Sequence, residues 1–403
     1  MRYHHKLRII ITIFFIYIVF LPTNSHAVKN LAFNQHVQNK LLLENKTLPN
    51  PIPRFAFDSG FSFKYPDAVR GVYVTGHSAG GSTFEKLTSL VKDSELNAMV
   101  IDIKDDNGNL TYLPEKSSPF YPISKNYIKD PKKVINTLEK EQIYPIARVV
   151  VFKDTVLATK KPDLSFKDGK KVWKNGRGES FVNPFLQEVW DYNVNIAIEA
   201  AKLGFQEIQF DYVRFPEGFE RRDGELTFSE GKYAKSNQDN VQKRVTAVTD
   251  FVSYAKEKLE PYGVKVSVDI FGYTATLPEA PGIGQNFSKI SEHVDVISSM
   301  IYPSHWTSYF GISKPDLEPY RLITEYAKLE SQKLEQLKDK PISRPWIQDF
   351  TAAYLGKGNY QQYGKEEVEA QIKALNEQGI NEFLLWNAGN TYTQGVDYTP
   401  LTK

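Results

Sequence analysis

Four aspartates of this sequence, Asp102, Asp211, Asp269 and Asp349, each lie within a short stretch rich in apolar residues. Burying a carboxylate among apolar neighbours is costly unless the carboxylate is paired or takes part in chemistry. One such residue could be a structural ion pair, but four that converge indicate a reactive site. Cleavage of a glycosidic bond needs two carboxylates, one as acid and one as nucleophile or base. Our catalytic candidates are Asp211, Asp269 and Asp349.

Polar and aromatic residues accompany these aspartates and would suit the recognition of sugar hydroxyls and ring faces. The substrate-binding candidates are Asp102, Lys104, Arg148, Tyr212, Arg214, Tyr302, His305, Trp306, Trp346, Gln348, Trp386 and Asn387. Asp102 and Lys104 are expected to support the catalytic residues. Arg214 is expected to position a carboxylate and keep it ionised, although Asp211 could instead form a purely structural pair with Arg214 or Arg148. The tryptophans could equally belong to the core.

These candidates need elements that bring them together. Eight short stretches rich in Val, Ile, Phe and Tyr predict β-strands, at residues 69–75, 98–105, 144–152, 207–215, 265–272, 295–303, 344–350 and 382–387. Helical spacing of apolar residues predicts helices at residues 83–93, 131–141, 184–203, 242–259, 319–338 and 365–378. Eight strands alternating with helices favour an α/β fold of the closed (β/α)8 TIM barrel type over an open doubly wound sheet.

The barrel hypothesis makes two further predictions. Active sites of such barrels form at the C-terminal ends of the strands, which is where the candidate residues lie in strands two to eight. The eighth helix is expected to be short or missing, because only 16 residues follow the last predicted strand.

Three strand-end motifs resemble those of a bacterial family of glycoside hydrolase domains, first described as a domain of unknown function and distantly similar to α-amylase-type barrels. They are Asp-Tyr-Val-Arg-Phe-Pro at 211–216, Tyr-Pro-Ser-His-Trp at 302–306 and Trp-Ile-Gln-Asp-Phe at 346–350. The resemblance covers roughly residues 66–390. It implies a (β/α)8 barrel and glycosidase activity but does not identify the substrate. We expect the substrate to be a poly- or oligosaccharide.

The same resemblance implies roles for single residues. Asp211 matches the nucleophile after strand four, and Asp349 matches an aspartate that binds sugar hydroxyls after strand seven. Asp269 is the nearest match to the acid after strand five, where α-amylase-type barrels carry Glu. Retention of the anomeric configuration is implied likewise.

A competing motif is Gly76-His77-Ser78-Ala79-Gly80, which has the G-x-S-x-G pattern and lies between a predicted strand and a predicted helix. It would make Ser78 the nucleophile of a serine esterase with His293 or His305 as base. Against this, the order of strands differs from that of α/β-hydrolases, and no Gly-rich oxyanion motif precedes the serine. A third hypothesis is a non-catalytic, carbohydrate-binding or cell-wall-associated barrel.

Composition limits the partners. The chain has 50 basic and 48 acidic residues, a net charge of +2, so neither nucleic acid nor an anionic membrane is expected as a partner. It contains no cysteine, which excludes disulfides and thiolate metal sites. The histidines lack metal-ligand spacing, and no phosphate-binding or dinucleotide motif is present, so no metal and no cofactor are expected. The sequence leaves the oligomeric state open.

The N-terminus predicts export. Basic residues from Arg2 to Arg8 precede an apolar run at 9–21, and Ser25-His26-Ala27 fits a signal-peptide cleavage site. The run is shorter than the roughly 20 residues that span a bilayer, although an uncleaved anchor is the alternative. The predicted organisation is a signal peptide at 1–27, a lead-in and linker at 28–64 and the barrel at 65–403. The mature protein would be secreted or associated with the cell surface, without stable membrane insertion.

Overall fold

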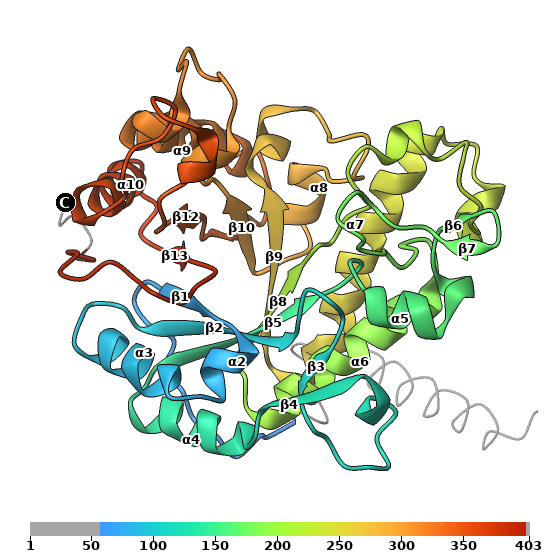
Figure 1. Cartoon of the computed structure of the whole chain (residues 1–403), viewed down its shortest axis with the longest axis horizontal. Helices are drawn as coiled ribbons and strands as arrows, with labels where there is room; N and C mark the ends of the chain where they lie inside the picture. The colour runs from blue at the N-terminus through green and yellow to red at the C-terminus, as the bar shows by residue number, and fades with distance from the viewer. Residues whose placement is uncertain (1–56, 400–403) are drawn as a thin grey trace, which may run out of the picture. The chain divides into compact units, whose positions relative to one another are not determined.

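A computed structural model describes residues 57–399; the predicted signal peptide and most of the lead-in lie outside these residues. Eight parallel strands form a closed barrel (Figure 1). In order around the barrel they are β1 (Arg70–Val74), β2 (Ala98–Lys104), β5 (Tyr144–Val150), β8 (Glu207–Asp211), β9 (Lys265–Phe271), β10 (Val296–Met300), β12 (Trp346–Gln348) and β13 (Phe383–Trp386). Strand β1 pairs with both β2 and β13, which closes the ring. The predicted (β/α)8 barrel is confirmed.

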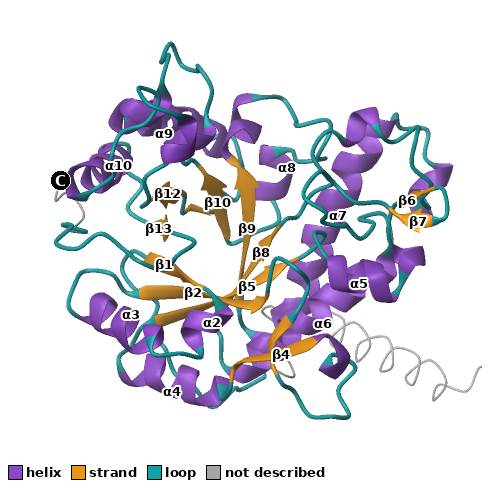
Figure 2. Cartoon of the chain, viewed as in Figure 1, coloured by secondary structure: helices purple, strands orange, loops and turns teal. Residues whose placement is uncertain are grey.

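Helices lie between the strands and surround the barrel (Figure 2). The six predicted ones are α3 (Thr83–Lys92), α4 (Pro131–Lys140), α6 (Gln187–Leu203), α7 (Asn240–Leu259), α9 (Pro319–Leu334) and α10 (Lys365–Glu377). Helix α6 begins three residues after the predicted Pro184, whose carbonyl accepts a hydrogen bond from the indole of Trp190 at 2.8 Å. Three short helices were not predicted: α2 (Gly76–Ala79), α5 (Thr155–Lys160) and α8 (Phe287–Ser291).

Short strands lie within the connections between the larger elements. Strands β3 (Leu110–Tyr112) and β4 (Ser124–Ile128) follow β2, and β11 (Ile342–Ser343) precedes β12. The hairpin of β6 (Lys167–Asp168) and β7 (Lys171–Val172) lies in the long connection after β5. Among the described residues, no helix is long and apolar enough to cross a membrane.

Alternation along the strands separates two cores, because successive strand residues point to opposite faces. Residues such as Val72, Ile101 and Val149 face the helices and form the larger core. Every second residue faces the interior of the barrel, here called the lumen, as Val69, Tyr73, Val100 and others do. Side chains near the C-terminal end of each strand therefore meet at one opening, here called the mouth.

The opposite end of the lumen is filled by a buried ion cluster. Arg344 donates to Glu207 at 2.7 Å and to Glu382 at 2.7 Å. The hydroxyl of Tyr65, just before β1, accepts from Arg344 at 2.9 Å and donates to Glu382 at 2.9 Å. The buried guanidinium thus has two carboxylate partners where the N-terminal strand ends meet, which compensates its charge. Oε2 of Glu207 is buried without a hydrogen-bond partner among residues 57–399.

No helix follows β13 in the described part of the chain, as expected. Residues 387–399, here called the C-terminal strap, run past the end of β1 instead (Figure 1). The side chain of Asn390 accepts from the backbone N–H of Thr75 at 2.9 Å and donates to the carbonyl of Tyr73 at 2.9 Å. Tyr392 donates to the same carbonyl. Polar side chains therefore hold the strap in the place where an eighth helix would lie.

Candidate active site

Arg148, on β5, is the centre of a charge network at the mouth and is only 1% exposed. Its guanidinium donates to Asp211 Oδ2 from Nε at 3.0 Å and from Nη2 at 2.6 Å. It also donates to Asp102 Oδ1 at 2.7 Å and to Asp106 Oδ1 at 2.8 Å. Charge-assisted hydrogen bonds of this kind are strong and directional. Arg148 therefore orients three carboxylates, which come from β2, the residues after it, and β8, on either side of β5.

Asp211, the last residue of β8, is held at both of its oxygens. While Oδ2 accepts from Arg148, Oδ1 accepts from the backbone N–H of Tyr212 at 2.6 Å. Tyr212 has a φ of +53°, in the left-handed region, a conformation that costs a non-glycine residue about 1–3 kcal/mol. Strain of this size next to a fixed carboxylate is typical of functional sites.

Asp269 lies on β9, the neighbouring strand, and is 2% exposed. Phe210 and Val268 are paired in register, so Asp211 and Asp269 each directly follow a paired residue. Asp269 Oδ1 accepts from the indole N–H of Trp346 at 2.8 Å. Burial, and then the charge of Asp211, raise the pKa of Asp269 well above its usual range, although Trp346 and Arg148 oppose the shift. Two carboxylates in such different environments can take different roles, one as acid and one as base or nucleophile.

Asp102 supports this arrangement from β2. It binds Arg148 through one oxygen and accepts from the hydroxyl of Tyr73 at 2.6 Å through the other. Burial raises the pKa of Asp102 to about 6, against the effect of Arg148. Asp102 thus contacts the same arginine that holds Asp211.

Aromatic rings cover the other side of the mouth. Trp386 stacks on Tyr73 with ring centroids 4.2 Å apart and planes inclined by 25°. Trp346 meets Trp386 edge-on at 5.6 Å, and Tyr302 lies 6.2 Å from Trp386. These rings come from β1, β10, β12 and β13 or the residues after them, and we call them the aromatic half. The charged half comes from β2, β5, β8 and β9.

Lys104 is not at the mouth, contrary to the prediction that it binds substrate. A β-bulge at Ile103 shifts the register between β2 and β5, so that Lys104 pairs with Val149, whose side chain faces the helices. The fully buried ammonium donates to Asn193 of α6 at 3.0 Å and pairs with Asp154 at 2.7 Å. Lys104 therefore ties the barrel to its outer layer.

Arg214 does not contact Asp211, and the structure gives the expected positioning role to Arg148 instead. The guanidinium of Arg214 lies 4.8 Å from the ring centroid of Tyr212 and 4.6 Å from that of Phe271. It also donates to Glu217 at 3.2 Å. Cation–π contacts of this kind stabilise the wall between the ends of β8 and β9.

Asp349 is not brought to Asp211 and Asp269. It lies one residue out of phase with the lumen-facing Gln348, and its carboxylate accepts from the backbone N–H of Thr393 at 3.1 Å and from its hydroxyl at 2.6 Å. Asn387, another predicted binding residue, donates to the carbonyls of Asp349 at 2.6 Å and Thr391 at 2.7 Å. Both side chains anchor the C-terminal strap.

The remaining predicted residues lie at the end of β12 and on the loop after β10. Gln348 is buried and accepts from the backbone N–H of Ser304 at 3.0 Å, so it shapes the loop after β10. His305 is exposed, and its Nδ1 lies 3.1 Å from the hydroxyl of Ser304. Trp306 packs against Tyr326 of α9 at a centroid distance of 5.9 Å, away from the aromatic half.

Three residues at the mouth were not predicted: Tyr73, Asp106 and Lys153. Lys153 Nζ donates to Asp106 at 2.8 Å and lies 4.1 Å from the ring centroid of Tyr212. Asp106 and Lys153 each directly follow a predicted strand, where site residues of a barrel are found. Tyr73 shares the alternation of Val69, which faces the lumen. The sequence therefore contained a signal for each residue: the position directly after a strand for Asp106 and Lys153, and the strand alternation for Tyr73.

Ser78 lacks the geometry of a nucleophile elbow. It lies in the four-residue helix α2 and is not among the described non-glycine residues with positive φ, whereas the nucleophile of an elbow occupies a strained turn. The neighbouring His77 packs on Tyr127, with ring centroids 3.7 Å apart. This arrangement gives no support to the esterase hypothesis.

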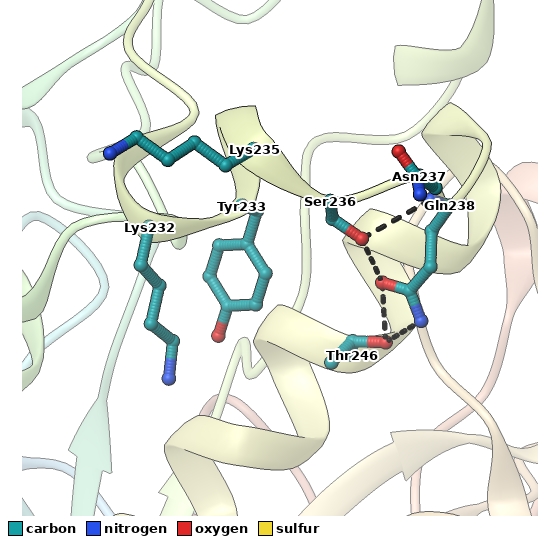
Figure 3. A pocket seen from close by; sticks show the side chains of 7 residues that line it. All are labelled: Lys232, Tyr233, Lys235, Ser236, Asn237, Gln238 and Thr246. Atoms are coloured by element: carbon teal, nitrogen blue, oxygen red, sulfur yellow. Dashed lines mark hydrogen bonds between the residues drawn. The ribbon is translucent and has the colours of Figure 1, made fainter. Parts of the chain in front are cut away.

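Two further observations concern a pocket away from the mouth and possible metal sites. An open pocket of about 770 Å³ lies at the start of α7 and in the segment before it, lined by Lys232, Tyr233, Lys235, Ser236, Asn237, Gln238 and Thr246 (Figure 3). It contains none of the residues of the mouth. Within residues 57–399, no group of three or more His, Asp or Glu side chains is placed to bind a metal ion.

A family model described as "Putative glycosyl hydrolase domain" matches residues 71–392. A hypothetical protein from Ruminiclostridium thermocellum is 32% identical over 49% of this chain and 96% of its own, with a TM-score of 0.42. The PgaB (BpsB) glycoside hydrolase domain from Bordetella bronchiseptica is 13% identical and matches 81% of this chain and 95% of its own, with a TM-score of 0.57, which reflects a common fold. No curated protein matches the sequence.

Proposed function

The chain belongs to this glycosyl hydrolase domain family, and from that premise we propose that Asp211 and Asp269 are the catalytic pair that cleaves its carbohydrate substrate. The observation that carries the proposal is the contrast between two buried carboxylates on neighbouring strands. Asp211 accepts from a guanidinium and a backbone N–H, whereas Asp269 has a raised pKa and a single indole donor. The first suits a nucleophile and the second an acid.

In the proposed reaction, Asp269 donates its proton to the leaving glycosidic oxygen while Asp211 attacks the anomeric carbon. Asp269, now ionised, then removes a proton from the water that hydrolyses the glycosyl-enzyme intermediate. Arg148 and Tyr212 keep the nucleophile in one orientation. The aromatic half provides ring faces against which a sugar can stack, opposite the charged half.

We propose that the reaction retains the anomeric configuration. Neighbouring strands lie about 4.8 Å apart, and both aspartates follow the paired residues Phe210 and Val268. This placement agrees better with the separation of about 5–5.5 Å typical of retaining enzymes than with the roughly 6.5–9.5 Å of inverting ones. A retaining enzyme first releases a product with the anomeric configuration of the substrate, which NMR of the early product would detect.

We also propose that the protein acts outside the cell, on a poly- or oligosaccharide, as a barrel of residues 65–403 preceded by a lead-in at 28–64. The support is the basic segment and apolar run within residues 1–27. Secretion would bring the enzyme to cell-surface and extracellular glycans, which are its proposed substrates.

The test is Asp211→Asn, which keeps the shape of the side chain and removes its charge. The parent is screened against cell-surface and extracellular polysaccharides, with products sized by mass spectrometry. On a substrate found in this way, the variant should lose several orders of magnitude in kcat because the nucleophile is gone. Unfolding measurements show whether the variant is folded.

Asp349→Asn is the matched control, because Asp349 is also a buried aspartate at a strand end but binds Thr393. It should retain activity. If Asp349→Asn lost activity while Asp211→Asn kept it, the proposed pair would be incorrect. Binding of a polysaccharide by the parent without any turnover would indicate the non-catalytic carbohydrate-binding barrel instead.

A further inference from the structure

The aromatic half continues outward from the lumen onto the loops after β10 and β12. Tyr302 meets His305 edge-on at a centroid distance of 5.2 Å. Phe350 lies 6.3 Å from Tyr302 and 6.4 Å from His305. Tyr354, in the connection after β12, is 68% exposed, the largest exposure of any large hydrophobic residue among those described. The rings from Trp386 to Phe350 form one connected series, and Tyr354 is joined to it through Ser304.

Tyr354 is exposed but not free to move as a surface tyrosine would be. It lies in a 3-10 turn, Ala353–Leu355, and its hydroxyl donates to the hydroxyl of Ser304 at 3.2 Å. Ser304 is buried, and Gln348 fixes its backbone. The same serine hydroxyl lies 3.1 Å from Nδ1 of His305. One buried residue thus holds both a ring and an imidazole at the surface, which lowers the entropy that a ligand must overcome on binding.

We propose that Tyr354 and His305 form a second sugar-binding subsite, so that the substrate is a chain of at least two sugars. A pyranose ring would lie on the exposed face of Tyr354, and His305 would hydrogen-bond one of its hydroxyls. The inference rests on the proposed function, because it assigns the second subsite to the substrate of the catalytic pair. A single exposed ring beside hydrogen-bonding groups suits a sugar face, whereas a protein partner needs a much larger apolar patch.

The experiment compares Tyr354→Ala and Tyr354→Trp with the parent. The probes are oligosaccharides of two to six sugars, prepared from the polysaccharide that the parent cleaves, and a nitrophenyl glycoside of the same sugar. In the parent, kcat/KM should rise with chain length once the second subsite is occupied. Tyr354→Ala should reduce this gain about tenfold, mainly through KM, as expected for the loss of one stacking contact. Tyr354→Trp should restore it.

Tyr320→Ala is the matched control, because Tyr320 is an exposed tyrosine of α9 that hydrogen-bonds Glu377 and takes no part in the site. It should leave the dependence on chain length unchanged. If Tyr354→Ala showed the dependence of the parent, the second subsite would be incorrect and the proposed function would stand. If the parent cleaved none of the polysaccharides, the proposed function would fail, and the subsite with it.

Discussion

At the scale of single residues, Arg148 and Lys153 are the two cations in the described part of the chain that contact the carboxylates of the charge network at the mouth. Arg148 contacts Asp102, Asp106 and Asp211, and Lys153 also contacts Asp106. Breaking a buried pair leaves an uncompensated charge, which typically costs 3–5 kcal/mol. Loss of Arg148 would therefore affect both folding and the orientation of Asp211, so the arginine is a poor choice for separating the two effects.

The protonation of Asp102 is the better probe of this network. Burial raises the pKa of Asp102 to about 6, against ~3.9 in an unfolded chain. The folded protein therefore binds this proton more tightly, and stability increases as the pH falls from about 6 to about 4. Asp102→Asn does not titrate at this position. From pH 7 to pH 4, the free energy of unfolding of the parent should rise by roughly 2 kcal/mol relative to the variant.

Chemical denaturation at several pH values measures this difference. A difference between parent and variant that is independent of pH would show that Asp102 titrates normally. The variant Asn390→Ala serves as the control, because it removes no titratable group. Its difference in stability from the parent should not depend on pH.

The sequence predicts the site where alternation along the strands is regular. Asp211, Asp269 and Arg148 reach the mouth as their phase requires. Lys104 does not, because the bulge at Ile103 reverses its direction, and no sequence pattern marks that bulge. The prediction for Asp349 fails for a related reason, because Asp349 lies one residue beyond Gln348, the lumen-facing residue at the end of a short strand.

At the scale of elements, the C-terminal strap takes the place of the eighth helix. The sequence indicates that a helix is missing there, but not what replaces it. The replacement depends on long-range hydrogen bonds, from Asn390 and Tyr392 to the end of β1 and from Thr393 to Asp349. Contacts between residues 44 to 319 positions apart leave no periodic signal in a single sequence.

Asn390→Ala tests the strap. Asn390 is buried, has a φ of +51°, and satisfies two backbone groups at the end of β1. Alanine would leave the N–H of Thr75 unpaired and the carbonyl of Tyr73 with Tyr392 as its remaining side-chain donor. It would also tolerate the left-handed backbone less well, so we expect a loss of about 2–4 kcal/mol in unfolding free energy. Asn390→Asp keeps the acceptor for Thr75 and should lose less. Equal stability of all three proteins would show that the side chain of Asn390 does not stabilise the strap.

At the scale of the whole molecule, the last prediction concerns the boundary between exported leader and mature enzyme. If residues 1–27 are a signal peptide, the mature protein begins near Val28. N-terminal sequencing of protein from the culture medium or cell surface measures this directly, with protein from inside the cell as the control. An intact Met1 in the exported material would exclude cleavage.

The ion cluster of Arg344, Glu207, Glu382 and Tyr65 has a consequence for how this protein can evolve. It lies at the end of the barrel opposite the mouth, and none of its side chains touches Arg148, Asp211 or Asp269. Mutations that change the loops at the mouth therefore do not disturb the contacts that close the other end. Substitutions at the mouth can therefore change the substrate specificity during evolution, while selection for folding preserves the ion cluster at the other end of the barrel.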